Sequence, residues 1–163
     1  AGIFEGIAED APDDEWHAAW SRTVQVNLQS AADFSRLALN HFRERGEGGR
    51  IVNVSCRAAY RGDSPQHCHY AASKAGIAAM TKTMARAYAP EAIYCYAVCP
   101  GFTVTGMAED YMTSRGTAGF SDIPLGRPAT VEEVAETIRW LAVDAPASAS
   151  GALIDVNGAS YVR

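Results

Sequence analysis

The sequence predicts an α/β fold in which strands and helices alternate and the strands form one parallel sheet. Residues 50–55 form a short, continuous apolar run, which is typical of a parallel strand covered on both faces. Apolar residues recur at three- and four-residue steps between 24 and 42, which is the pattern of a helix. Further strands are predicted at 93–99 and 152–156. Because parallel strands need crossover connections, helices are expected on both faces of the sheet.

Each predicted helix has a recognisable beginning or end. Pro12 and the three acidic residues that follow it mark a helix N-terminus, where proline and negative charge are both favoured. The glycines in 46–49 end the long helical pattern and predict a flexible loop. A second long helix is expected at 70–88. A third begins after Thr130, which together with Glu133 has the spacing of a capping box.

Two connecting segments are expected to shape a site. Residues 57–69 are polar and join the strand at 50–55 to the second long helix. Residues 103–125 contain glycine and polar residues with little periodicity, and we expect them to form a mobile substrate lid that is partly helical around 108–114. No internal repeat and no low-complexity tract interrupts the chain.

Bulk properties exclude several classes of function. The chain has 163 residues, which is enough for one domain with a sizeable core. A net charge of -5 argues against a nucleic-acid groove. No apolar run approaches the ~20 residues of a membrane span, so no membrane partner is expected. The four cysteines show no disulfide-scaffold spacing, which indicates a cytoplasmic location.

Tyr70 and Lys74 are the most informative pair of residues. They lie four positions apart and therefore share one face of the predicted helix. An ammonium beside a phenol favours the phenolate, which predicts a pKa of Tyr70 below the usual value of about 10. Such a phenol can exchange a proton with an alcohol or a carbonyl compound. A surface tyrosine beside a solvated lysine has the same spacing, but the strand that ends at Ser55 favours a proton-transfer site at the carboxyl edge of the sheet.

Seven stretches of the chain together resemble the short-chain dehydrogenase/reductase family. They include VNL, IVNVSC, YAASKAG and PGFTVT, and they lie at 26–28, 51–56, 70–76, 100–105, 124–128, 130–135 and 151–158. They follow the family's order at near-family spacing. The resemblance implies a Rossmann-like doubly wound parallel sheet, of which 1–163 would be the C-terminal catalytic part of a single domain. The strand, glycine-rich turn and helix that would hold a pyrophosphate do not occur in this sequence.

The resemblance also implies roles for individual residues. Tyr70 would be the general acid in reduction and the general base in oxidation. Lys74 would also bind the nicotinamide ribose of NAD or NADP. Asn27 would anchor a water molecule that joins Lys74 to a proton relay. The nicotinamide end of the cofactor would be received by Pro100, Gly101, Thr103 and Thr105.

The chain departs from the family at one catalytic position. The family places a serine there, which donates a hydrogen bond to the substrate oxygen. Aligned on the strand, this position is Cys56, and Ser55 precedes it. A thiol is a weaker donor than a hydroxyl. Neighbouring strand residues point to opposite faces, so Ser55 could act as the alternative donor only by turning inward.

The implied function is that of an NAD- or NADP-dependent oxidoreductase for a small-molecule alcohol or carbonyl substrate. The resemblance implies a homodimer or homotetramer with the helices at 23–44 and 70–88 at one interface. Two alternatives remain open: an NAD-dependent epimerase or dehydratase, and a truncated, non-catalytic fragment that acts only in subunit association. The neighbours of Tyr70 match no strong zinc pattern and are expected to line the substrate entrance rather than to hold a metal; they are His67, Cys68 and His69.

Overall fold

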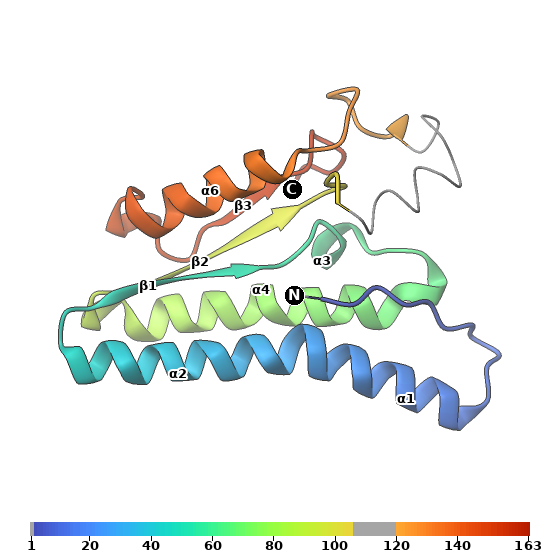
Figure 1. The fold of residues 1–163 in the computed structure, drawn as a ribbon, viewed down its shortest axis with the longest axis horizontal. Coiled ribbons are helices and arrows are strands. Elements are labelled where there is room, and N and C mark those ends of the chain that lie inside the picture. Colours follow the sequence, from blue (N-terminus) through green and yellow to red (C-terminus); the bar gives the residue numbers. More distant parts are fainter. Residues whose placement is uncertain (1, 106–119) are drawn as a thin grey trace.

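A computed structural model describes residues 2–105 and 120–163 of the chain. Its sheet contains three parallel strands in the order β1-β2-β3 (Figure 1). They are β1 (Gly49–Val54), β2 (Ile93–Pro100) and β3 (Leu153–Val156). Each lies within one residue of the predicted range at either end. The prediction of a parallel α/β sheet is therefore confirmed.

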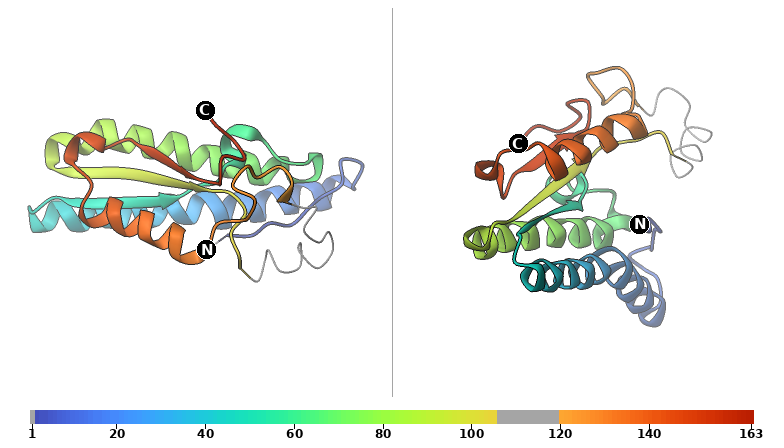
Figure 2. Two further views of the ribbon diagram at one scale, coloured as in Figure 1. Left: turned by 90° about the horizontal axis from the view of Figure 1, so that it is seen from above. Right: turned by 60° about the vertical axis from the view of Figure 1, so that its left-hand side comes forward.

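Helices cover both faces of the sheet (Figures 1 and 2). The crossover from β1 to β2 contains α4 (Cys68–Tyr88), which lies with α2 (Ser30–Arg45) on one face. The crossover from β2 to β3 contains α6 (Val131–Val143), which lies on the opposite face. Because it is covered on both sides, the central strand has no exposed surface at 95–99. This is the doubly wound, Rossmann-like arrangement.

A long helical arm precedes the sheet. It consists of α1 (Asp13–Val24), a π-helical turn η1 (Gln25–Gln29) and α2, without a break between them. Gly46 adopts a left-handed conformation at φ 70° and ends the arm, as its position after the last helical turn predicts. The apolar residues that recur between 24 and 42 are expected to face the core. For Phe34 this expectation is wrong, because the residue is 73% exposed.

The segment between β1 and α4 is more ordered than its polar sequence indicates. It contains the single-turn helix α3 (Ala58–Arg61) and the 3₁₀ turn η2 (Pro65–His67). The helix that carries Tyr70 begins at Cys68, two residues before the predicted start. The described residues also contain the 3₁₀ turns η3 (Ala89–Glu91) and η5 (Ala147–Ala149).

The core consists of two apolar clusters, one on each face of the sheet. The cluster beneath α2 and α4 contains Leu39, Ile51, Met84, Ala85, Ile93 and Cys95. The cluster beneath α6 contains Tyr96, Val98, Leu141 and Ala145. These clusters fix the strands against the helices and thereby help to position the residues that follow the strands.

The capping box predicted for the third helix is confirmed. The Thr130 hydroxyl accepts a hydrogen bond from the Glu133 backbone N–H at 3.2 Å, and the Glu133 carboxylate accepts one from the Thr130 backbone N–H at 2.8 Å. The Arg127 guanidinium and the Thr130 backbone N–H lower the pKa of Glu133 to about 2. No helix in the described part of the chain is long and apolar enough to cross a membrane.

The predicted lid at 103–125 is described only at its two ends. Residues 106–119, with the expected helix at 108–114, lie outside the described residues. At the near end, Thr103 pairs with Ala129 in an isolated parallel bridge. At the far end, Phe120 is buried and its ring packs edge-on against another aromatic ring. Both ends are therefore packed against the body of the protein.

Candidate functional site

Tyr70 and Lys74 share one face of α4, as their spacing predicts. The Lys74 ammonium lies 5.8 Å from the centroid of the Tyr70 ring. Its Nζ donates a 3.2 Å hydrogen bond to the carbonyl oxygen of Val54, the last residue of β1. Lys74 is buried and Tyr70 is half-buried. The first turns of α4 therefore carry both groups to the carboxyl edge of the sheet.

The predicted direction of the Tyr70 pKa is wrong. Burial raises this pKa above its usual value, and the charge and hydrogen bond of the neighbouring Cys56 raise it further. Burial likewise lowers the pKa of Lys74. The ammonium lies beside the ring and bonds to Val54, so desolvation outweighs its attraction for a phenolate. Tyr70 is thus held in its protonated form at neutral pH.

Cys56 and Ser55 face different partners at the end of β1. Cys56 lies close enough to the Tyr70 hydroxyl to raise the pKa of Tyr70. Ser55 is buried, and its hydroxyl donates a 2.8 Å hydrogen bond to the Lys74 carbonyl oxygen. Both residues directly follow β1, and of the two only Cys56 lies beside the phenol.

Asn27 lies in the π-helical turn and is buried. Its Oδ1 accepts a 2.8 Å hydrogen bond from the Ile3 backbone N–H, and its Nδ2 donates to the Ile3 carbonyl oxygen at 3.0 Å. Nδ2 also lies 3.4 Å from the Ser73 hydroxyl. The amide therefore holds the N-terminal segment against α4, as an ordinary buried amide with satisfied hydrogen bonds would. π-Helical turns are nevertheless frequent at functional sites.

The N-terminal segment forms one wall of the site. A side chain added at Gly2 would lie 3.7 Å from the Lys74 Nζ. The Phe4 ring meets the Tyr70 ring edge-on at a centroid distance of 4.8 Å and stacks on the His67 ring at 3.9 Å. Sequence reasoning missed Phe4, because only its contact with Tyr70 distinguishes it from other apolar residues.

The three residues before Tyr70 differ in their surroundings. His67 lies beside Phe4, and its Nδ1 is 2.7 Å from the Ser64 hydroxyl. Burial lowers the pKa of His67. His69 is fully buried against Trp20, with ring centroids 5.8 Å apart, so the expectation that it lines an entrance is wrong. Within residues 2–105 and 120–163, no group of three or more His, Cys, Asp or Glu residues could hold a metal ion.

The segment predicted to receive a nicotinamide lies at the end of β2. The Gly101 backbone N–H donates a 3.0 Å hydrogen bond to Val156, and a Cβ on Gly101 would lie 2.8 Å from the Asn157 Cβ. The close approach that requires glycine here is thus to the end of β3. The Thr103 hydroxyl donates to the Gly101 carbonyl oxygen at 3.3 Å, whereas Thr105 is exposed.

Arg57 is a second residue that sequence reasoning did not assign to the site. Its backbone N–H donates a 2.9 Å hydrogen bond to the Pro100 carbonyl oxygen, which joins the ends of β1 and β2. Its side chain is buried and lies over the Phe102 ring. The signal that could have revealed it is an arginine placed directly after an apolar strand.

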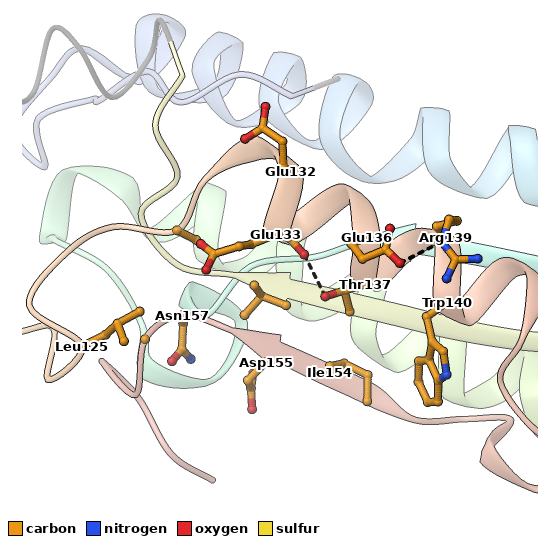
Figure 3. Close-up of a pocket in the computed structure, with 13 residues that line it drawn as sticks. Leu125, Glu132, Glu133, Glu136, Thr137, Arg139, Trp140, Ile154, Asp155 and Asn157 are labelled. Atoms are coloured by element: carbon orange, nitrogen blue, oxygen red, sulfur yellow. Dashed lines mark hydrogen bonds and ion pairs between the residues drawn. The ribbon is translucent and has the colours of Figure 1, made fainter.

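A separate groove lies between α6 and β3, on the face of the sheet opposite α4 (Figure 3). Acidic side chains of α6 border it, and Ile154 and Asp155 of β3 form its other wall. Glu136 is paired there with Arg139 at 2.8 Å. None of the residues predicted to carry chemistry lines this groove.

Several known proteins are similar to this chain in sequence or in structure. A family model described as enoyl-(acyl carrier protein) reductase matches residues 2–159. The 3-oxoacyl-(acyl-carrier-protein) reductase FabG of Pseudomonas aeruginosa is 35% identical over 150 residues, which cover 92% of this chain and 58% of that protein. Cis-4-hydroxycyclohexanecarboxylate dehydrogenase of Sinomonas cyclohexanicum is 37% identical over 155 residues, covering 94% of this chain and 61% of that protein.

A solved structure shows the same arrangement of elements. The putative 2-deoxy-d-gluconate 3-dehydrogenase from Agrobacterium tumefaciens, with bound NADP, superposes with a TM-score of 0.86 at 25% identity. The match covers 100% of this chain and 65% of that one. The chain spans 58% of the length of the Pseudomonas aeruginosa reductase. With its family match, its relatives and its doubly wound sheet, this chain belongs to the short-chain dehydrogenase/reductase family.

Proposed function

We propose that the protein is an NAD(P)-dependent oxidoreductase that interconverts a carbonyl compound and a secondary alcohol, with Tyr70 as the general acid or base. The observation that supports this most directly is the convergence of three groups at the carboxyl edge of the sheet. Cys56 is the electrostatic neighbour of the Tyr70 hydroxyl, and the Lys74 ammonium lies beside the same ring.

Each of these groups has a distinct role in the proposed reaction. The Tyr70 hydroxyl gives its proton to the carbonyl oxygen in reduction and takes it back in oxidation. Its raised pKa keeps it protonated at neutral pH, which favours the reductive direction. The Cys56 thiol donates a hydrogen bond to the same substrate oxygen, and Ser55 serves only as a structural residue.

The residues present fit a nicotinamide nucleotide, which would supply or accept the hydride. The Lys74 ammonium has three donors, and among the described residues one hydrogen bond, to Val54, is seen. Donors thus remain for the hydroxyls of a ribose. The end of β2, from Pro100 to Thr105, would hold the nicotinamide. One structural relative binds NADP, and we propose NAD or NADP for this protein. Asn27 would act by holding the N-terminal segment beside Lys74.

The substrate is a small-molecule alcohol or carbonyl compound. The relatives act on different compounds: one is named for a 3-oxoacyl group on acyl carrier protein, and another for a cyclic alcohol that bears a carboxylate. The family match alone therefore leaves open which alcohol is used. We also propose a homodimer or homotetramer whose interface includes the arm at 13–45 and α4.

The proposed function is tested by measuring turnover and nucleotide binding in the full-length protein. The native protein is screened with alcohols and ketones in the presence of both nucleotides, and a Tyr70→Phe variant is then assayed with the best substrate. Loss of general acid catalysis lowers the rate about 10²- to 10⁴-fold. Quenching of tryptophan fluorescence by NADH or NADPH should persist in the variant, since the phenyl ring remains.

The matched control is Tyr88→Phe, because Tyr88 ends the same helix far from the β1 terminus. It should keep native turnover. Full turnover by Tyr70→Phe would remove the acid/base assignment. Nucleotide binding with epimerisation or dehydration in place of net redox turnover would favour the epimerase or dehydratase, and a full-length protein that binds neither nucleotide would favour a non-catalytic role in subunit association.

A further inference from the structure

Arg57 is a buried cation whose side chain lies close enough to Cys56 to interact with it electrostatically. It directly follows Cys56, and its side chain is only 8% exposed. The guanidinium carbon lies 4.6 Å from the centroid of the Phe102 ring, in a cation–π arrangement. Because these two residues follow β1 and β2, the guanidinium lies at the carboxyl ends of the strands, where open α/β sheets bind their ligands.

The positive charge of Arg57 is only partly balanced by nearby carboxylates. The Arg57 Nη1 lies 3.7 Å from the Asp122 Oδ2, which is too long for a hydrogen bond. The same oxygen lies 3.3 Å from the Arg61 Nη2, so one carboxylate serves two guanidinium groups. Among the described residues, Nη1 is buried without any hydrogen-bond partner. Leaving a buried charge in this state is costly.

The electrostatic balance at Arg57 agrees with this geometry. Burial and repulsion by Arg61 lower its pKa, and attraction by Asp122 and Asp63 does not restore it. Asp63 is also engaged elsewhere, because its carboxylate accepts a 2.8 Å hydrogen bond from the Ser64 backbone N–H. A further anion would therefore be favourable at Nη1.

We propose that Arg57 binds a carboxylate of the substrate, so that the protein acts on an oxo acid or a hydroxy acid. This rests on the proposed oxidoreductase function. A guanidinium matches a carboxylate with two parallel hydrogen bonds. Asp122 shows that a carboxylate can reach these two arginines. Packing on Phe102 already holds the guanidinium in place, so little side-chain freedom is lost on binding.

A purely structural role for Arg57 makes a different prediction. If the side chain only packs against Phe102, substrates with and without a carboxylate are treated alike. The test therefore uses pairs of compounds that differ only in this charge: 2-oxobutanoate, 3-oxobutanoate and 4-oxopentanoate, each beside its methyl ester. The series varies the distance between the carbonyl and the carboxylate.

The first measurement compares kcat/KM for each acid and its ester in the native full-length protein. At least one acid should be preferred over its ester about tenfold or more, as expected for a charged hydrogen bond. In Arg57→Gln this preference should fall about tenfold, mainly through KM. Arg57→Lys keeps the positive charge but loses the planar pair of N–H donors that matches a carboxylate. It should retain part of the preference for the acid over its ester. The control Arg86→Gln removes an exposed arginine of α4 and should keep the native ratio.

The second measurement separates this proposal from the oxidoreductase function. The shift in melting temperature caused by each acid and each ester is recorded for the same four proteins, which requires no turnover. If no compound is turned over but acids bind in an Arg57-dependent way, the oxidoreductase function fails and the carboxylate site stands. Equal treatment of acids and esters in the native protein, or an acid preference that survives in Arg57→Gln, overturns the carboxylate site. The native comparison decides this even if Arg57→Gln does not fold.

Discussion

The Ser55 hydroxyl donates a 2.8 Å hydrogen bond to the carbonyl oxygen of Lys74, which engages the single proton of that hydroxyl. The hydroxyl is buried and engaged with the backbone of α4. Cys56, the next residue, is the neighbour of the Tyr70 hydroxyl. The proposed donor to the substrate oxygen is therefore a thiol.

Replacing this thiol by a hydroxyl should make the protein a faster enzyme. In Cys56→Ser, a stronger donor takes the same position, and kcat/KM for carbonyl reduction should rise about tenfold or more. Ser55→Ala should leave kcat/KM within about twofold and lower the free energy of unfolding by about 1 kcal/mol, because it removes the bond to Lys74. Steady-state kinetics and chemical denaturation of the two variants check both outcomes. A large loss of rate in Ser55→Ala alone would reverse the assignment.

The raised pKa of Tyr70 predicts different pH profiles for the two directions of the reaction. Oxidation needs the deprotonated phenol, so its rate should rise with pH and show no plateau below about 10, the usual tyrosine value. Reduction needs the protonated phenol and should be independent of this group between pH 6 and about 9. In Cys56→Ser the oxidation profile should move to lower pH, because Cys56 contributes to raising the pKa. An oxidation rate that levels off near pH 7 would contradict this assignment.

The order of the elements could be predicted because their signals are local. The buried apolar run gives β2 at 93–100, and the Thr130–Glu133 spacing gives the start of α6, both within a residue or two. Other elements depend on contacts made after folding. The short helix α3 packs on α4, and its four residues are too few to form a stable helix without such a contact.

The proximity of Tyr70, Lys74 and Cys56 was predictable, but the electrostatics around them were not. The spacing of Tyr70 and Lys74 places both on one face, and the strand alignment places Cys56 near them. The direction of the Tyr70 pKa depends on burial and on the thiol, neither of which the spacing reveals. The contribution of Phe4 and Arg57 depends on segments far apart in the sequence.

Gly101 should tolerate alanine poorly, because a methyl group there would meet the Cβ and the backbone of Asn157. The new Cβ would lie 2.8 Å from the Asn157 Cβ and 2.9 Å from its Cα, so β2 and β3 would have to separate. Gly101→Ala should lower the free energy of unfolding by about 1–3 kcal/mol. The matched control is Gly76→Ala, where the Cβ meets only the end of the Leu28 side chain, which can rotate, and where alanine favours the helix. Its effect should stay below about 1 kcal/mol; equal losses in the two variants would refute this comparison.

The capping box of α6 should stabilise the protein over a wide pH range. Thr130→Ala removes the side-chain cap and should cost about 1 kcal/mol in thermal or chemical unfolding at pH 7. The pKa of Glu133 falls from its ordinary 4.5 to about 2 in the folded protein. A lowered carboxyl pKa gives stability that is complete above 4.5 and is lost as pH falls towards 2. Glu133→Gln should therefore lose stability at pH 7 and differ less from the native protein at pH 2. Thr137→Ala, on the same exposed helix, should have little effect.

The exposed apolar residues of α2 test the proposed assembly. Phe34 and Leu37 are 73% and 55% exposed, and burying them against a second copy would remove that apolar surface from water. If the arm and α4 form the interface, Phe34→Asp should place a charge inside it and lower the oligomeric mass measured by light scattering. Val143→Asp changes a residue on α6, across the sheet, that is 63% exposed, and should retain at least the dimer formed through α2 and α4. A native mass for Phe34→Asp, in a protein that is itself oligomeric, would place the interface elsewhere, because an unpaired carboxylate cannot be buried there without a large cost.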